Sequence, residues 1–274
     1  MAVGSDADVV FVHQANDGVE DAEAQAQAVA IAKRVVELLG AIGPEPALEI
    51  DADLRPEGRN GPLARSLGAY REYYERWALG WERQALLRAR PVAGDRAVAA
   101  GFMELAQGVR YRPEGLSPKE TVELRRLKAR VERERLPRGL EPSRHVKLGP
   151  GGLLDVQWVA QLYQLRHAGE YPSLRVTGTI EALEACVAEG LMAPDDARLL
   201  IEAWLLAMSI RNGNALWSGK LGAPAADVVP SEGRALAGLA ALLNYPAGGT
   251  AQLLEDHHRM ARRARAVFDR LFFA

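Results

Sequence analysis

Cysteine is nearly absent from this chain of 274 residues, since Cys186 is the only one. A single thiol excludes an internal disulfide framework and a cysteine-based zinc cluster, and the simplest interpretation of Cys186 is a small buried apolar residue. The five histidines show no spacing typical of metal ligands. The sequence therefore predicts neither a disulfide-stabilised fold nor a Cys/His metal centre.

A strong charge imbalance and long apolar runs are also missing. The 34 basic and 36 acidic residues give a formal net charge of -2, so nothing attracts the whole chain to nucleic acid or to acidic membranes. There is no apolar run of about 18 residues and no signal-peptide pattern, which favours a soluble cytoplasmic protein. The apolar fraction of 48% permits two domains of ordinary size or one large domain with an extension.

Two aspartates near the N-terminus are the most informative feature. Asp6 and Asp8 lead into the apolar stretch Val9–Val12, and residues two apart on a strand project from one face. Paired carboxylates are costly to keep ionised without a cation, and Mg2+ takes oxygen ligands of this kind. The pair suggests metal-dependent phosphoryl or nucleotidyl transfer, whereas on the motif alone a solvated strand end is favoured by about two to one.

A second acidic strand is expected at residues 47–54, after a helix at residues 21–39. Its apolar residues alternate with Glu49, Asp51 and Asp53. If this strand pairs with the first, the acidic faces lie side by side. Three carboxylates on one face match the requirement of a two-metal site, in which the ions lie about 3.5 to 4 Å apart.

Aromatic and basic residues follow. A helix is expected at residues 67–87, whose aromatic stripe is more often core than a platform for stacking bases. Residues 88–95 alternate as a short strand with Arg88 and Arg90 on one side. These arginines could contact a triphosphate, although an ion pair with Glu82 is at least as well supported.

The second half of the sequence predicts helices and no strand. The charged helix expected at residues 117–135 is interpreted as a solvated connector, with the domain boundary near it. Further helical periodicity indicates a bundle, at residues 155–167, 179–188, 195–212, 231–243 and 250–273.

A glycine-rich segment at residues 147–155 precedes the first helix of this bundle. Its backbone N–H groups, together with Lys147, could hold an anion at the helix N-terminus. Ordinary architecture is favoured over this role by about three to one.

Several of these segments, in this order, resemble the adenylyltransferase region of the glutamine synthetase adenylyltransferase family of bacterial nitrogen control. The resemblance covers essentially the whole chain, and the block at residues 81–90 is similar to the AMP-adding copy rather than the AMP-removing one. The matching pieces are residues 5–9, 49–56, 61–63, Tyr73 with residues 81–90, and 147–155.

The resemblance implies an α+β fold in three parts. A polymerase-beta-like nucleotidyltransferase domain, truncated at its N-terminus, is expected at residues 1–115. A connecting helix and linker would follow at residues 116–146, and an all-helical bundle domain at residues 147–274.

The resemblance also implies site residues. Asp6, Asp8 and Asp51 match the family's catalytic carboxylates, which hold two Mg2+ ions and orient ATP as the substrate, and Asp51 is also the candidate general base. Asp53 is a less secure match because relatives often have arginine there. The candidates for nucleotide and phosphate binding are Ser5, Arg88, Arg90 and Lys147.

The implied function is transfer of AMP from ATP to a tyrosine of glutamine synthetase. A PII-type signalling protein is the second expected partner, in the full-length enzyme, and neither nucleic acid nor a membrane is expected. Two alternatives stay open: the deadenylylating copy, which releases AMP as ADP by phosphorolysis, and a non-catalytic regulatory interaction module.

One departure from the family pattern concerns the start of the chain. The family has a glycine-rich turn upstream of the first aspartate, whereas only Met1–Val3 precede Gly4 here. The chain therefore resembles a fragment cut at the catalytic motif, or a sequence with an incorrectly chosen start. We expect it to fold yet to bind ATP poorly and to transfer AMP weakly or not at all.

Overall fold

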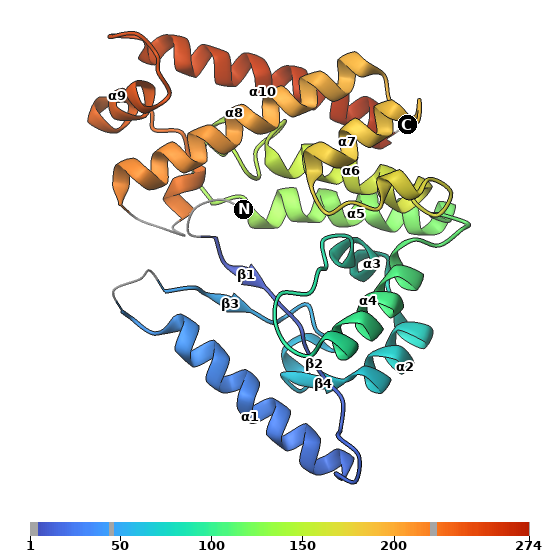
Figure 1. The fold of residues 1–274 in the computed structure, drawn as a ribbon. Helices are drawn as coiled ribbons and strands as arrows, with labels where there is room; N and C mark the ends of the chain where they lie inside the picture. The colour runs from blue at the N-terminus through green and yellow to red at the C-terminus, as the bar shows by residue number, and fades with distance from the viewer. Residues whose placement is uncertain (1–4, 44–46, 220–223, 274) are drawn as a thin grey trace. The chain divides into compact units, whose positions relative to one another are not determined.

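A computed structural model describes residues 5–43, 47–219 and 224–273, with no account of the side chains at 224 and 225. The chain divides into two compact units, Ser5–Arg112 and the part that follows from Pro113 (Figure 1). The domain limits expected from the sequence stay a prediction. The sequence prediction about a glycine-rich turn concerns the start of the chain. Residues 1–4 there lie outside the described ranges.

The N-terminal unit combines short parallel strand pairs with helices. Strand β1 pairs with β3, and strand β2 pairs with β4. Helix α1 follows β2 and precedes β3, so it lies in the connection between the two strands of each pair. The elements are β1 Ala7–Asp8, β2 Phe11–His13, α1 Asp21–Gly40, β3 Ile50–Asp51, η1 Gly58–Asn60, β4 Ala64–Ser66, α2 Leu67–Trp77, α3 Gly80–Leu86 and α4 Arg96–Arg110.

Helix α1 lies along the strands, in contact with β2, β3 and β4 (Figure 1). Asp21 and Glu23 stand in its first turn, where negative charge favours the helix dipole. The core of the unit forms between α2, α3 and α4, where the Tyr70 and Phe102 rings meet edge to face at 5.2 Å. Its buried members are Tyr70, Tyr74, Leu86, Phe102, Ala106 and Val109.

Two predictions for this unit are wrong. The helix expected at residues 67–87 is broken at Ala78 and Leu79, because the Glu82 carboxylate accepts a hydrogen bond from the Leu79 N–H at 2.9 Å and starts a new helix. Trp77, at the end of α2, is 66% exposed, so the aromatic stripe is core only in part. The strand expected at residues 88–95 is absent from that described segment, which consists of turns and coil.

The C-terminal unit is a helical bundle, and each helix expected for it is present. Helix α8 packs against α10 and α6 (Figure 1). Among the described residues of this unit, the only strand-like pairing is the isolated bridge between His145 and Val228. The elements are α5 Pro118–Arg135, η2 Pro142–Arg144, α6 Leu153–His167, η3 Pro172–Leu174, α7 Thr179–Ala188, α8 Pro194–Ser218, η4 Pro224–Asp227, α9 Gly233–Leu242 and α10 Thr250–Phe273.

Helix α5 begins with a capping box, in which the Ser117 hydroxyl accepts from the Glu120 N–H at 3.2 Å and the Glu120 carboxylate accepts from the Ser117 N–H at 2.9 Å. Leu124 and Lys128 of α5 are buried. One side of α5 is therefore buried. This corrects the interpretation from the sequence, in which the helix was a solvated connector. None of the helices in the described ranges is long and apolar enough to cross a membrane.

Candidate functional site

The first two candidate strands pair directly. Strands β1 and β3 are parallel, with Ala7 opposite Ile50 and Asp8 opposite Asp51. The Val9 N–H donates to the Asp51 carbonyl at 2.7 Å. Register partners on neighbouring strands project from the same face, so the side chains of Asp8 and Asp51 share a face.

Asp6 directly precedes β1 and stands two residues before Asp8, so an extended backbone continued by one residue would turn both side chains to one face. Asp6 and Asp8 are exposed, whereas Asp51 is half-buried. The strand pairing on which the predicted acidic face depends is thus present.

Asp51 and Asp53 have different surroundings. The Asp53 N–H donates to Oδ1 of Asp51 at 2.7 Å. This hydrogen bond engages one oxygen of the Asp51 carboxylate and not the other. The Asp53 carboxylate lies 2.6 Å from Nε of Arg59 and 3.5 Å from Nη1 of Arg55. The hydrogen bond to Asp53 raises the pKa of Arg59. Asp53 is thus an ion-pair partner of the following loop.

An open hollow of about 400 Å³ adjoins this acidic strand. Carboxylates from the β3 segment and basic side chains from α1 and the loop after β3 line it together. The charged residues in its wall are Lys33, Glu37, Glu49, Asp51, Asp53, Arg55 and Arg59.

The fit of a divalent cation can be judged from these positions. Carboxylates on one face of adjacent strands, whose backbones lie about 4.8 Å apart, are donors of the type that Mg2+ takes. In the described residues, however, no three His, Cys, Asp or Glu side chains gather closely enough to hold an ion. The residue types and their strand positions are those of a divalent cation site, whereas the described side chains are not gathered into one.

The predicted phosphate-binding residues are dispersed along the chain. Ser5 is half-buried directly before Asp6, and Arg88 and Arg90 are exposed after α3. Glu82, the alternative partner for these arginines, is buried and caps α3. Burial raises the pKa of Glu82, and its hydrogen bonds with Leu79 and Tyr73 oppose that effect.

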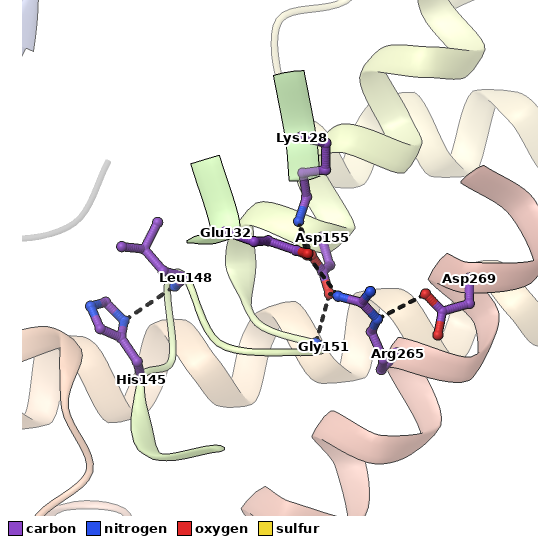
Figure 2. A network of polar contacts seen from close by, with 8 residues as sticks. All are labelled: Lys128, Glu132, His145, Leu148, Gly151, Asp155, Arg265 and Asp269. Carbon is purple, nitrogen blue, oxygen red and sulfur yellow. Dashed lines mark hydrogen bonds and ion pairs between the residues drawn. The ribbon is translucent and has the colours of Figure 1, made fainter. Parts of the chain in front are cut away.

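The glycine-rich segment that includes Lys147 uses its backbone donors internally. The Gly149 N–H donates to the His145 carbonyl at 2.8 Å, and the Gly152 N–H to the Gly149 carbonyl at 2.9 Å. The Gly151 N–H donates to Oδ2 of Asp155 at 2.7 Å (Figure 2). These contacts favour the architectural interpretation of the loop, because its N–H groups are already bonded.

Asp155 is the centre of a buried charge network in the C-terminal unit (Figure 2). Its side chain is 1% exposed, and Nζ of the fully buried Lys128 lies 2.5 Å from its Oδ1. Arg265 of α10 lies 3.3 Å from the other Asp155 oxygen and 2.7 Å from Glu132. Burial raises the pKa of Asp155 while the two cations oppose that shift. The network ties α5, α6 and α10 together.

Known proteins match this chain in two blocks. Residues 1–105 match the family model described as glutamate-ammonia ligase adenylyltransferase, and residues 124–272 match the one described as GlnD PII-uridylyltransferase. Both descriptions are of nucleotidyltransferases, and each block lies mainly in one of the two units.

Curated relatives specify the family. The chain is 49% identical over 273 residues to a bifunctional glutamine synthetase adenylyltransferase/adenylyl-removing enzyme of Streptomyces avermitilis, covering 100% of the chain and 27% of the relative. The relatives of the same name from Streptomyces coelicolor and Mycobacterium leprae are each 47% identical, over 100% and 99% of the chain and 27% of their own length. The chain belongs to this adenylyltransferase/adenylyl-removing enzyme family, which confirms the resemblance in the motifs, and it spans about a quarter of the length of these relatives.

Proposed function

We propose that this chain carries the metal-binding carboxylates for transfer of AMP from ATP to a tyrosine of glutamine synthetase. The observation that carries the proposal is the register of Asp8 opposite Asp51 on parallel strands, with Asp6 two residues away. The names of the relatives support the reaction class. The match of the C-terminal unit to a PII-uridylyltransferase model supports a PII-type protein as a partner of the full-length enzyme.

We assign the N-terminal unit to the polymerase-beta-like nucleotidyltransferase fold. Parallel strand pairs joined through a crossover helix, with paired aspartates on one strand and a third on its neighbour, support this assignment. The C-terminal unit is then the all-helical accessory domain.

The chemistry proposed for these residues is an in-line displacement. Asp6, Asp8 and Asp51 would hold Mg2+, which supplies charge neutralisation at the phosphates. The tyrosine oxygen forms a bond to the alpha phosphorus while the bond to pyrophosphate breaks, and pyrophosphate leaves with that electron pair. Asp51 is the proposed base that takes the proton of the phenol, a group whose ordinary pKa is about 10. Ser5, Arg88 and Arg90 are the proposed phosphate contacts in the N-terminal unit. Lys147 belongs to the glycine-rich loop of the other unit, whose internal hydrogen bonds favour an architectural role.

Transfer of label from the alpha phosphate of ATP to purified glutamine synthetase tests this proposal. We expect Mg2+-dependent labelling that falls at least about a hundredfold in Asp8→Asn and in Asp51→Asn. Glu37→Gln is the matched control, because it removes an exposed carboxylate from the same hollow and should keep the wild-type rate. Labelling that survives Asp51→Asn contradicts the proposal.

Two further assays separate the alternatives. Phosphate-dependent release of ADP from adenylylated glutamine synthetase would identify the deadenylylating copy. Capture of glutamine synthetase that persists after Asp6→Ala and Asp8→Ala, by a chain that binds no nucleotide, would identify an interaction module.

A further inference from the structure

Arg55 is an unusual loop residue because its side chain is directed inward. The residue is only 9% exposed, although arginine is rarely buried without partners. Its Nη1 donates to the Ala52 carbonyl at 2.7 Å, and its Nε donates to the Gly61 carbonyl at 3.2 Å. The guanidinium thus joins the two ends of the loop that follows β3.

The backbone of this loop closes around Arg55. The Gly58 N–H donates to the Arg55 carbonyl at 2.9 Å, and the Gly61 N–H donates to the Gly58 carbonyl at 3.2 Å. Glu57 adopts a left-handed conformation with φ 64°. A Cβ atom at Gly61 would collide with the Pro56 carbonyl, so the loop has little freedom to adopt another path.

The peptide group between Ala52 and Asp53 connects Arg55 to the acidic site. Its carbonyl accepts from Arg55, and its N–H donates to Oδ1 of Asp51 at 2.7 Å. A trans peptide is planar, with its C=O and N–H pointing in opposite directions, so fixing the carbonyl also orients the N–H. A cation on the carbonyl oxygen polarises the group and strengthens the N–H as a donor.

We infer that Arg55 is a positioning residue for Asp51, acting through the Ala52–Asp53 peptide rather than through contact with a nucleotide. The inference rests on the proposed function only for the identity of Asp51 as a metal ligand. The peptide holds one oxygen of Asp51, so the other oxygen is presented to a cation in a defined direction.

The test compares Arg55→Met and Arg55→Lys with a control, Arg59→Met, in the full chain. Arg59 is the exposed partner of Asp53, whereas within the described residues it is Arg55 whose side chain donates to the Ala52 carbonyl, so removal of Arg59 leaves the peptide held. Two readouts are needed: binding of Mn2+ alone, followed by electron paramagnetic resonance, and hydrogen exchange of the Asp53 amide, followed by NMR.

We expect Arg55→Met to weaken Mn2+ binding about tenfold, which is about 1.4 kcal/mol, and to speed exchange of the Asp53 amide by at least a similar factor. Arg55→Lys, which keeps the charge but has no planar fork, should lie between Arg55→Met and wild type. Arg59→Met should keep the wild-type exchange rate of the Asp53 amide and should not weaken Mn2+ binding, because Arg59 acts on Asp51 only through its charge, and loss of a nearby positive charge favours a cation. If Arg55→Met does not fold, an intermediate loss in Arg55→Lys still supports the inference and wild-type behaviour in that variant overturns it.

The outcomes separate the two claims. Failure of the wild-type chain to bind Mn2+ would contradict the proposed metal site, while faster exchange of the Asp53 amide in Arg55→Met would still support the positioning role. A folded Arg55→Met chain with wild-type Mn2+ affinity and wild-type amide exchange would overturn the inference.

Discussion

Nζ of Lys128 lies 2.5 Å from Oδ1 of Asp155, and both side chains are almost completely buried. Removing one member of such a pair leaves a charge without full compensation, so Lys128→Met should lower the free energy of unfolding by about 3 kcal/mol. The exposed Lys119 of the same helix is the control, and Lys119→Met should cost no more than about 0.5 kcal/mol. Urea unfolding followed by circular dichroism measures both, and equal small effects would contradict the network's role.

Gly151 should tolerate no side chain. Its φ is +72°, and a Cβ atom would collide with the carbonyl of Ala261 in α10. Gly190 has a similar φ of +70° but open space around it. Gly190→Ala should therefore cost about 1 kcal/mol through backbone strain alone, whereas Gly151→Ala should cost at least about 3 kcal/mol. Equal shifts in melting temperature would show that the loop does not pack closely on α10.

Stability of the C-terminal unit should fall on acidification because of His145. Burial lowers the pKa of His145, with Lys147 and Arg211 adding to this and Asp227 opposing it. Its Nδ1 accepts from the Leu148 N–H at 3.1 Å (Figure 2), an interaction that needs the neutral ring. The stability contribution is therefore present above the unfolded pKa of about 6.5 and is lost as pH falls toward the lowered folded pKa.

The variant His145→Gln isolates this effect. Unfolding free energies measured across pH of about 5 to 8 should decline less steeply on acidification in the variant than in the wild type. Parallel profiles for the two proteins would show that His145 does not contribute.

The hydroxyl of Tyr70 is a weak point of the N-terminal core. It is buried without a hydrogen-bond partner among the described residues, although the ring itself packs on Phe102. Tyr70→Phe removes only the oxygen and should leave stability unchanged or raise it by about 1 kcal/mol. Tyr70→Ala should cost about 3 to 5 kcal/mol, since it also removes the ring. A loss above about 1 kcal/mol in Tyr70→Phe would reveal an unrecognised partner for the hydroxyl.

The sequence predicts local features of the fold well and distant ones poorly. Helices such as α7 and α10 have clear periodicity and end signals, and their observed bounds equal the expected ones. The break at Ala78 was not predictable, because alanine and leucine favour helix and the new start depends on the Glu82 side chain. The amphipathic helix α4 was missed altogether.

The same distinction applies to the polar sites. Alternation alone indicated that Asp51 would face Asp8 once the strands paired, and this pairing is present. The engagement of Asp53 by Arg59 depends on the path of a loop that carries no periodic signal. Burial of Lys128 was not foreseen, because its partner Asp155 is far away in the sequence and a charged helix normally faces solvent.

Calorimetric titration of ATP into the chain, with and without Mg2+, tests the central claim most directly. The account predicts weak but saturable binding in wild type and in Glu37→Gln that requires Mg2+, and loss of that binding in Asp51→Asn. Binding that is independent of Mg2+, or that is unchanged in Asp51→Asn, would contradict the assignment of the paired strands β1 and β3 as the metal and nucleotide site.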